Sequence, residues 1–251
     1  MAGHSKWNNI KRRKESQDTK RAKVFTKIST EIFAAVRESG DDPQTNLRLR
    51  LALSKAKAEN MPNDNIERTI KKALGEEGGV TYEELTYEGY GPGGAAVMVK
   101  VLTDNKNRSA ANVRLAFNKN GGNLGENGCV SFLFQRKGVL AIDKESAGGE
   151  EEDLMLDAIE AGAAEVEVLG ESYELLTDPE DFESVKNALE KSEYTFKTAE
   201  VTMVPTTMSE LGDNDAEKMI KLIDALEDND DVQSVYHNFQ IDQKQLDRLE
   251  V

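Results

Sequence analysis

The chain has 251 residues, of which 38% are hydrophobic and 31% charged, and its formal net charge is -15. This length predicts two or three domains. The chain has no apolar run of about 18 residues, and its N-terminus lacks the apolar segment of a signal peptide, so we expect neither a membrane span nor a signal peptide. Its single cysteine, Cys129, rules out an intramolecular disulfide and a cysteine-cluster metal site, and indicates a soluble protein of a reducing compartment.

The N-terminal segment is strongly basic although the whole chain is acidic. Residues 1–27 hold nine Lys or Arg against Glu15 and Asp18, a local charge of +7. Such separation of charge is typical of segments that bind polyanions, most often nucleic acid. His4 and Trp7 lie among the cations, so a ring could stack on a base while cations bind phosphates. The alternative is a solvated tail without a specific role.

We expect nine residues of this segment to contact nucleic acid. They are Lys6, Trp7, Lys11, Arg12, Arg13, Lys14, Lys20, Arg21 and Lys23. Residues 1–74 together carry a net charge of +8, and the other 177 residues carry -23. Because the acidic body repels phosphate at long range, only the basic segment and its surroundings can easily face nucleic acid.

Three short amphipathic helices are predicted after the basic segment. The first runs from Val24 to Gly40, the second starts at Asp42-Pro43 and ends at residues 60–62, and the third runs from Asp64 to Gly75. The apolar positions that we expect in their shared core are Phe25, Ile28, Ile32 and Val36, then Leu47, Leu51 and Ala58, then Ile66, Ile70 and Leu74. Each helix has one apolar face, so residues 24–75 predict a small bundle.

A linker at residues 76–79 separates this bundle from a strand at residues 84–88 and a second strand at residues 95–101. Gly89, Gly91 and Gly94 between them match the pattern GxGxxG. A dinucleotide-binding loop needs a helix after the glycines, whereas here a strand follows and Pro92 interrupts the turn. The pattern therefore favours a sharp turn between strands.

A helix at residues 109–119 follows, and it brings a basic cluster into the acidic body. The cluster comprises Lys106, Arg108, Arg114 and Lys119. It could extend the nucleic-acid surface, pair with acidic faces of the same chain, or serve only solubility. We place the second-tier contacts to nucleic acid at Lys27, Arg48, Lys55, Lys106 and Arg108. A glycine-rich loop at residues 120–128 leads to a predicted strand at residues 129–134, in which Cys129 is an inert core residue.

From Val139 the predicted elements follow the order βαββαβ of a ferredoxin-like unit, ending in the strand 196–204. The flanking segments, with a helix at 215–227 and a strand at 232–239, predict a second such unit cut open by the first. The last ten or so residues are expected to be a frayed tail. The predicted fold is α+β, with an N-terminal three-helix bundle followed by two ferredoxin-like α/β domains, one inserted in the other. The expected domains are residues 1–78, residues 79–134 with 206–251, and the insertion at 135–205.

The sequence does not assemble a catalytic site. His4 lies in the basic segment, His237 lies at a strand end, and the carboxylate runs at 150–153 and 228–231 fall in loops or at helix ends. Nothing groups a nucleophile, a base and an orienting residue. We expect no catalytic residue, no metal, no cofactor and no small-molecule substrate.

Four motifs together resemble the YebC family. They are Ala2-Gly-His-Ser-Lys-Trp7, Tyr87-Glu-Gly-Tyr-Gly-Pro-Gly-Gly94, Gly121-Gly-Asn-Leu-Gly125 and Asp231-Val-Gln-Ser-Val-Tyr-His-Asn238. The resemblance covers essentially the whole chain, and the departures at Ala22 and Cys129 change no charge. It implies a non-enzymatic bacterial cytoplasmic protein with a helical and two α/β domains. Members are described as DNA-binding transcriptional regulators, or as translation factors that act on the ribosome at proline-rich stretches.

The residues favour one of three hypotheses. A flexible basic arm with an aromatic residue suits structured RNA and the ribosome. A sequence-specific DNA reader needs a recognition helix, for which the second helix offers Gln44, Asn46, Arg48 and Arg50, although the short turn of a helix-turn-helix is not evident. A protein adaptor would use the acidic α/β domains. We prefer the RNA-binding hypothesis.

Overall fold

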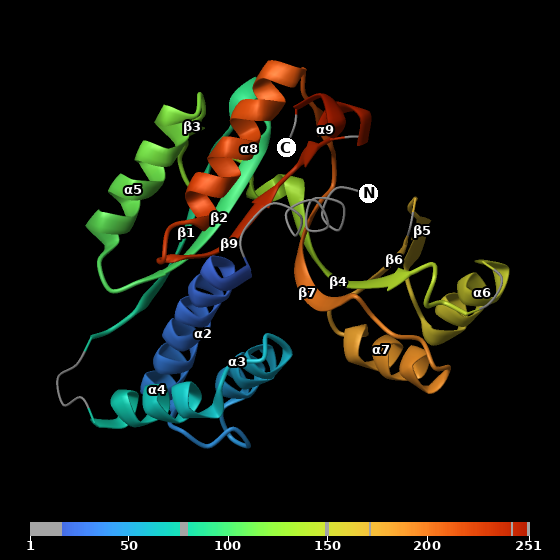
Figure 1. Ribbon diagram of the computed structural model, residues 1–251, viewed down its shortest axis with the longest axis horizontal. Helices are drawn as coiled ribbons and strands as arrows, with labels where there is room; N and C mark the ends of the chain where they lie inside the picture. The colour runs from blue at the N-terminus through green and yellow to red at the C-terminus, as the bar shows by residue number, and fades with distance from the viewer. Residues whose placement is uncertain (1–16, 76–79, 149–150, 171, 242, 250–251) are drawn as a thin grey trace.

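The computed structural model describes residues 17–75, 80–148, 151–170, 172–241 and 243–249, without the side chains of residues 17–20, 243, 246 and 247. Figure 1 shows a helical bundle beside two β-sheets, each with its own helices. The α+β fold predicted from the sequence is therefore confirmed, including the insertion of one α/β unit into the other.

The bundle consists of three helices that share one core. They are α2 (Gln17–Ser39), α3 (Leu47–Ala58) and α4 (Asn63–Gly75). Ile28, Ile32 and Val36 of α2 are buried against α3 and α4, as the spacing predicted. The helix α2 begins before Val24, so Lys20, Arg21 and Lys23 lie on the helix that enters this core.

The predicted face of α3 was wrong. Leu49, Ala52 and Ala56 are buried, whereas Leu47 and Leu51 are 57% and 61% exposed. Ala58 is also exposed, and in α4 Ala73 is buried in place of Leu74. The pattern failed in α3 because leucines occur on both of its faces; the helix also starts at Leu47, with Asn46 as its N-cap, instead of at Asp42-Pro43.

Asn46 sets this start and the orientation of α3. Its side-chain oxygen accepts a hydrogen bond from the Leu49 backbone N–H (3.0 Å). Its amide donates to the carbonyl oxygens of Ala35 (2.8 Å) and Gly40 (2.7 Å) at the end of α2. One buried side chain therefore caps α3 and fixes it against the preceding helix.

The first sheet is antiparallel, with the order β3-β1-β2-β9. Its strands are β1 (Glu83–Tyr90), β2 (Ala96–Thr103), β3 (Asn123–Leu124) and β9 (Val232–His237). The helices α5 (Lys106–Lys119) and α8 (Asp213–Glu227) pack on one face, where Val97, Val99 and Val101 meet Phe117 and Met219. The strand order is that of a ferredoxin-like sheet in which β1, although first in the chain, occupies the third strand's place.

The strand predicted at residues 129–134 was wrong. Residues 129–133 form a turn and a short 3-10 helix, η2 (Ser131–Leu133), and β3 provides the strand that follows α5. The carboxylate of Glu88 accepts hydrogen bonds from the backbone N–H groups of Val130 and Ser131, which a strand ladder would need. Alternating apolar residues in this segment therefore do not produce a strand.

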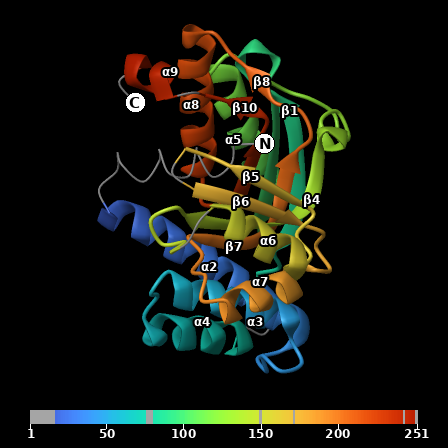
Figure 2. The same ribbon diagram turned by 90° about the vertical axis from the view of Figure 1, so that its right-hand side faces the viewer.

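The inserted unit has the predicted βαββαβ order and the sheet order β5-β6-β4-β7, with antiparallel neighbours. Its elements are β4 (Phe134–Asp143), α6 (Glu151–Ala161), β5 (Glu165–Val168), β6 (Ser172–Thr177), α7 (Phe182–Lys191) and β7 (Thr198–Pro205). Figures 1 and 2 show α6 and α7 on one side of this sheet. There Leu140 and Leu175 pack against Leu154, Val185 and Leu189.

The two sheets meet through a small cluster on the face of the first sheet opposite α5 and α8. Ala96 and Met98 of β2 are buried there against Val130, Phe134 and Met203. The insertion leaves and returns at neighbouring points, because Phe134 at the start of β4 pairs with Pro205 at the end of β7. The division of the chain into residues 1–78, 79–134 with 206–251, and 135–205 remains our proposal.

The frayed C-terminal tail predicted from the sequence was wrong. The chain forms a short parallel pair between β8 (Ser209–Glu210) and β10 (Phe239–Gln240), and then the helix α9 (Gln243–Leu249). Arg248 of α9 binds both carboxylate oxygens of Asp213 (2.9 and 3.0 Å), and Gln245 donates to the Leu211 carbonyl (2.7 Å). These contacts hold α9 beside the start of α8.

Candidate nucleic-acid interface

The cations predicted in the basic segment divide at the start of the described chain. Lys6, Trp7, Lys11, Arg12, Arg13 and Lys14 lie outside the described residues. Lys20 is in the first turn of α2, and Arg21 is exposed one residue later. The described part of the segment is thus helical and continuous with the core helix of the bundle.

Lys23 and Lys27 face the end of α8. The Nζ atom of Lys23 lies 2.5 Å from Oδ1 of Asp228, and that of Lys27 donates to the Glu227 carbonyl oxygen at 2.8 Å. The last carbonyls of a helix carry a partial negative charge that attracts cations. Two residues expected to bind phosphate therefore connect α2 to the first α/β unit.

Arg48 joins the bundle to the first sheet. Its guanidinium contacts Glu31 (2.7 Å), Glu38 (2.8 Å) and Glu84 (2.5 Å), which belong to α2 and β1. Burial disfavours its charge, but the hydrogen bonds that it donates to Glu31 and Glu38 and the charge of Glu84 raise the pKa of Arg48 above its ordinary value. The fork that would grip a phosphate is occupied by carboxylates.

Two of the four cations in the basic cluster of α5 bind carboxylates of the same chain. Lys106 forms an ion pair with Glu83, and Arg108 binds Asp231 (2.6 and 3.1 Å) and Asp104 (2.7 Å). The hydrogen bonds that Arg108 donates to Asp231 and Asp104 raise its pKa above the ordinary value. This pairing with acidic groups of the same chain is one of the alternatives that the sequence left open. The other two cations of this cluster, Arg114 and Lys119, are exposed, as is Lys55 of α3.

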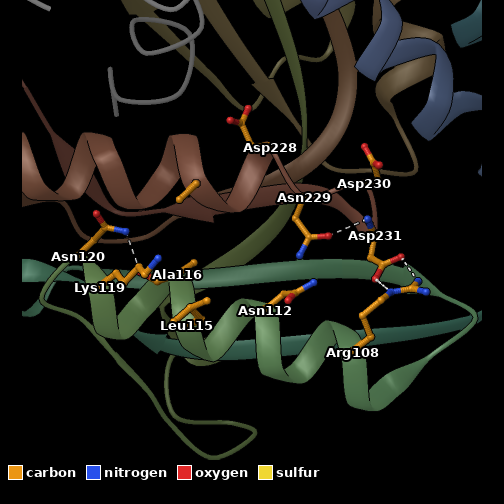
Figure 3. A pocket seen from close by; sticks show the side chains of 11 residues that line it. Arg108, Asn112, Leu115, Ala116, Lys119, Asn120, Asp228, Asn229, Asp230 and Asp231 are labelled. Atoms are coloured by element: carbon orange, nitrogen blue, oxygen red, sulfur yellow. Dashed lines mark hydrogen bonds and ion pairs between the residues drawn. The ribbon is translucent and has the colours of Figure 1, made fainter.

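A groove of about 670 Å³ lies between α5 and the loop after α8 (Figure 3). One wall carries Arg108, Asn112, Leu115, Ala116, Lys119 and Asn120, and the other carries Ala225, Asp228, Asn229, Asp230 and Asp231. Figure 3 shows the ion pair between Arg108 and Asp231 at one end and Asn112 facing Asn229 across the gap. Three aspartates along one wall disfavour a phosphate ligand. Among the described residues, no group of three or more His, Cys, Asp or Glu side chains is arranged to hold a metal ion.

The two glycine-rich motifs of the sequence lie against each other. Gly122 backs onto the carbonyl of Tyr90, where an added Cβ would lie 2.8 Å from the oxygen. A Cβ on Gly89 would lie 2.5 Å from the Asn123 carbonyl oxygen, which leaves no space for any other residue. The glycines thus permit close backbone contact, and the strand β2 after Gly94 confirms a turn in place of a nucleotide-binding loop.

Glu88, which was not among the predicted functional residues, holds the end of the glycine-rich loop and the turn that follows it. Its carboxylate is 6% exposed and accepts hydrogen bonds from the backbone N–H groups of Gly128 (2.9 Å), Val130 (2.9 Å) and Ser131 (2.8 Å). Burial alone would raise the pKa of Glu88, but these donors lower it below its ordinary value. In the sequence, Glu88 falls on the polar side of the β1 alternation, opposite Leu85 and Tyr87, so the pattern gave no signal of this role.

Cys129 follows this loop and is half-buried. Burial, and then the negative charge of Glu88, raise the pKa of the thiol. A raised pKa keeps the sulfur protonated and poorly nucleophilic. This supports the inert role predicted for Cys129.

A second basic segment lies in the acidic body. Residues 96–137 hold seven Lys or Arg against Asp104 and Glu126, a net charge of +5, whereas residues 75–251 as a whole carry -23. The segment contains α5, the glycine-rich loop and η2. Within the described ranges, no helix is both long and apolar enough to cross a bilayer.

Two family models match the chain. The model described as the TACO1/YebC protein N-terminal domain matches residues 5–76, and that of the TACO1/YebC second and third domain matches residues 82–239. These two matches include the bundle, both sheets and the Glu88 turn.

Similar proteins include curated relatives and a solved structure. A "Probable transcriptional regulatory protein" of Geobacillus kaustophilus is 61% identical over 238 residues, which cover 95% of this chain and 97% of that one. YrbC of Bacillus subtilis, described in the same words, is 58% identical over 239 residues, covering 95% and 99%. The crystal structure of a conserved hypothetical protein from Aquifex aeolicus has a TM-score of 0.77 and 46% identity, and the match covers 90% of this chain and 93% of that one.

Proposed function

This chain belongs to the TACO1/YebC family, and on that basis we propose that it is a cytoplasmic, non-enzymatic regulator of gene expression that binds RNA on the ribosome. The observation that carries the proposal is the charge of +7 on residues 1–27 of a chain whose net charge is -15. Family resemblance suggests the finer role of a translation factor that relieves stalls at proline-rich stretches.

The proposed contacts follow from which cations have carboxylate partners. Lys23, Lys27, Arg48, Lys106 and Arg108 already bind acidic or carbonyl oxygens of the same chain, so a phosphate would have to compete for them. The main contacts that we propose are the other residues of the basic segment, whose charge carries the proposal, namely Lys6, Trp7, Lys11, Arg12, Arg13, Lys14, Lys20 and Arg21, with Lys55 as an additional one.

The packing of α2 supports an arm with a defined origin. Lys23 and Lys27 connect α2 to the end of α8, and the apolar residues of α2 form the bundle core. The described part of the basic segment therefore belongs to a helix with a fixed place on the acidic body. An arm anchored in this way can bind phosphates while the body, which repels them, faces away.

Sequence-specific DNA binding is the second candidate function, and the names of the curated relatives favour it. The structure of α3 argues against α3 as the reading helix. Of the four base-reading candidates named in the sequence, Asn46 is buried as the N-cap and Arg48 is bound by carboxylates, which leaves Gln44, in the turn before α3, and Arg50 exposed. A recognition helix needs several such side chains on one exposed face.

The test is co-sedimentation with ribosomes, together with binding to random and promoter duplex DNA at matched salt. The variants are the intact chain, a chain lacking residues 1–16, and the quadruple substitution of Lys11, Arg12, Arg13 and Lys14 by Ala. Deleting residues 1–16 leaves α2 and the Lys23–Asp228 contact in place. A matched control replaces four cations of the inserted unit, Lys144, Lys186, Lys191 and Lys197, by Ala.

We expect ribosome association that both arm variants lose and the control retains. Tight binding to a promoter over random duplex, without ribosome association, would instead support the transcriptional regulator. Ribosome association that survives both arm variants would favour an adaptor that binds protein through the acidic α/β units.

A further inference from the structure

Phe132 is the most exposed of the large hydrophobic residues in the described chain, at 70%. It is the middle residue of η2, the 3-10 helix that replaces the predicted strand. The nearest cations in sequence are Lys119, Arg136 and Lys137, and residues 119–137 contain a single acidic residue, Glu126. An exposed aromatic ring therefore lies within a basic part of an otherwise acidic body.

The backbone that carries this ring is held on both sides. Glu88 binds the N–H groups of Val130 and Ser131, and the Tyr90 hydroxyl donates to the Cys129 carbonyl at 2.8 Å. On the other side of the ring, the Leu133 carbonyl accepts from the Thr206 backbone N–H at 2.8 Å. Because the backbone of Phe132 is already fixed, less conformational entropy is lost when a ligand binds the ring.

The surroundings of Phe132 fit an unpaired nucleobase better than a protein. The exposed side chains near Phe132 in the sequence are the amides Asn123, Asn127 and Gln135, the cation Arg136 and one carboxylate, Glu126. Amides can bond base edges, the cation can bind a phosphate, and a phenyl ring stacks on any base. A protein anchor would instead be surrounded by apolar side chains.

We propose that Phe132 is a base-stacking residue of a second RNA contact, formed by the Glu88-bound turn and the basic segment 96–137. The ligand class is single-stranded RNA with an unpaired base. This inference rests on the proposed function, because it adds a stacking site to the phosphate contacts of the arm. The two contacts differ in kind, since stacking is insensitive to salt and phosphate binding is not.

The first experiment measures binding of the full chain to a fluorescein-labelled oligouridylate of about 12 nucleotides by anisotropy, a length suited to single-strand sites. We expect Phe132→Ala and Phe132→Leu to weaken binding about tenfold, the decrease expected for one stacked base. Phe132→Tyr should retain affinity. The matched control is Ile159→Ala, which removes a 64% exposed apolar residue from the acidic helix α6 and should change affinity less than about twofold.

A second experiment places a reporter at the site. Trp7 is the single tryptophan of the chain, so Trp7→Phe with Phe132→Trp gives one indole at position 132. Stacking on a base should quench its emission at saturating RNA, and duplex RNA of the same length should quench less. In the same background, Ile159→Trp should not be quenched.

The outcomes separate this inference from the proposed function. If the wild-type chain binds RNA through the arm but the indole at position 132 is not quenched, or if Phe132→Leu binds normally, the stacking site is wrong and the arm proposal stands. A Leu variant that binds RNA normally but no longer associates with ribosomes would identify position 132 as a protein contact and overturn the stacking role. If the wild-type chain binds no RNA, both proposals fail.

Discussion

At the residue scale, the carboxylate of Glu88 determines the shape of the turn between β3 and β4. Three backbone N–H groups converge on it from Gly128, Val130 and Ser131. Because these donors are largely buried, they would lose their partners if the carboxylate were removed, and no strand pairing replaces them. The carboxylate of Glu88 thus accepts the backbone hydrogen bonds that a neighbouring strand would otherwise accept.

Glu88→Gln should destabilise the fold by about 1–3 kcal/mol, because the amide oxygen cannot satisfy all three donors. Urea unfolding at neutral pH measures the difference, and Glu126→Gln on the same loop is the control, since Glu126 is exposed. An equal decrease in stability in both variants would contradict this account.

The pH dependence of the same contact has a definite sign. The folded-state pKa of Glu88 is lowered, so its contribution is fully present above the unfolded pKa and is lost as pH falls through the folded pKa. The stability difference between wild type and Glu88→Gln should therefore shrink below about pH 4. A difference that stayed constant from pH 7 to pH 3 would show that the carboxylate charge is unimportant.

Arg108 and Asp231 form the other contact that belongs to this scale. Asp231 is 8% exposed, and Arg108 also binds Asp104. A double-mutant cycle with Arg108→Ala and Asp231→Asn should give a coupling energy of about 1–2 kcal/mol, limited by the partial exposure of the guanidinium. The cycle of Lys106 with Glu83, an exposed pair, should give less than about 1 kcal/mol.

At the scale of elements, the position of α3 is fixed by Asn46 and not by its leucines. The sequence pattern placed the helix start four residues early, and it assigned the face of Leu47 and Leu51 to the core. The structure instead buries the small residues Ala52 and Ala56, which let α3 approach α2 closely, and leaves both leucines outside. Spacing alone could not decide this, because leucines occur on two faces of the helix.

Asn46→Ala should destabilise the bundle by about 2–3 kcal/mol, since it removes the N-cap and leaves the Ala35 and Gly40 carbonyls without their amide donor. Asn46→Asp should retain the cap but lose both donors, so its stability should lie between those of wild type and Asn46→Ala. Thermal unfolding followed by circular dichroism checks the order. Gln44→Ala, in the exposed turn before the cap, is the control.

Other elements followed more directly from the sequence. The inserted unit was predicted almost strand for strand, because its alternating helices and strands have clear periodicity and short turns. The segment 129–134 and α9 were missed because both depend on distant partners, Glu88 in one case and Asp213 in the other. The same limit applies to the cations, since Arg48 and Arg108 look free in sequence and are bound by carboxylates in the fold.

At the scale of the whole molecule, charge is distributed in a definite pattern. The basic segment, residues 1–27, continues into α2, which Lys23 and Lys27 connect to α8. The second basic segment, residues 96–137, contains α5 and η2. The remainder of the body is strongly acidic. A polyanion is therefore attracted to two places and repelled elsewhere, which orients it before contact.

Replacing Lys11, Arg12, Arg13 and Lys14 by Ala should flatten the plot of log K against log salt for single-stranded RNA. Each cation that no longer neutralises a phosphate changes the slope by about 0.7, so the four together account for at most about 2.8. Anisotropy titrations at several salt concentrations measure the slope. The four-cation control in the inserted unit should leave it unchanged, and an unchanged slope in the arm variant would refute phosphate binding by these residues.

The insertion begins and ends at adjacent points of the first α/β unit, so its removal would leave two chain ends that lie close together. Phe134 pairs with Pro205, and the Thr206 N–H binds the Leu133 carbonyl, so the two ends of residues 134–205 lie side by side. A turn of about two to five residues could join Leu133 to Thr206 in the manner of a hairpin loop, at the cost of the contacts that Phe134 and Met203 make with Ala96 and Met98 of the first sheet. Residues 134–205 alone would retain a complete ferredoxin-like sheet with both helices. The first α/β unit could therefore accept a different inserted domain between Leu133 and Thr206.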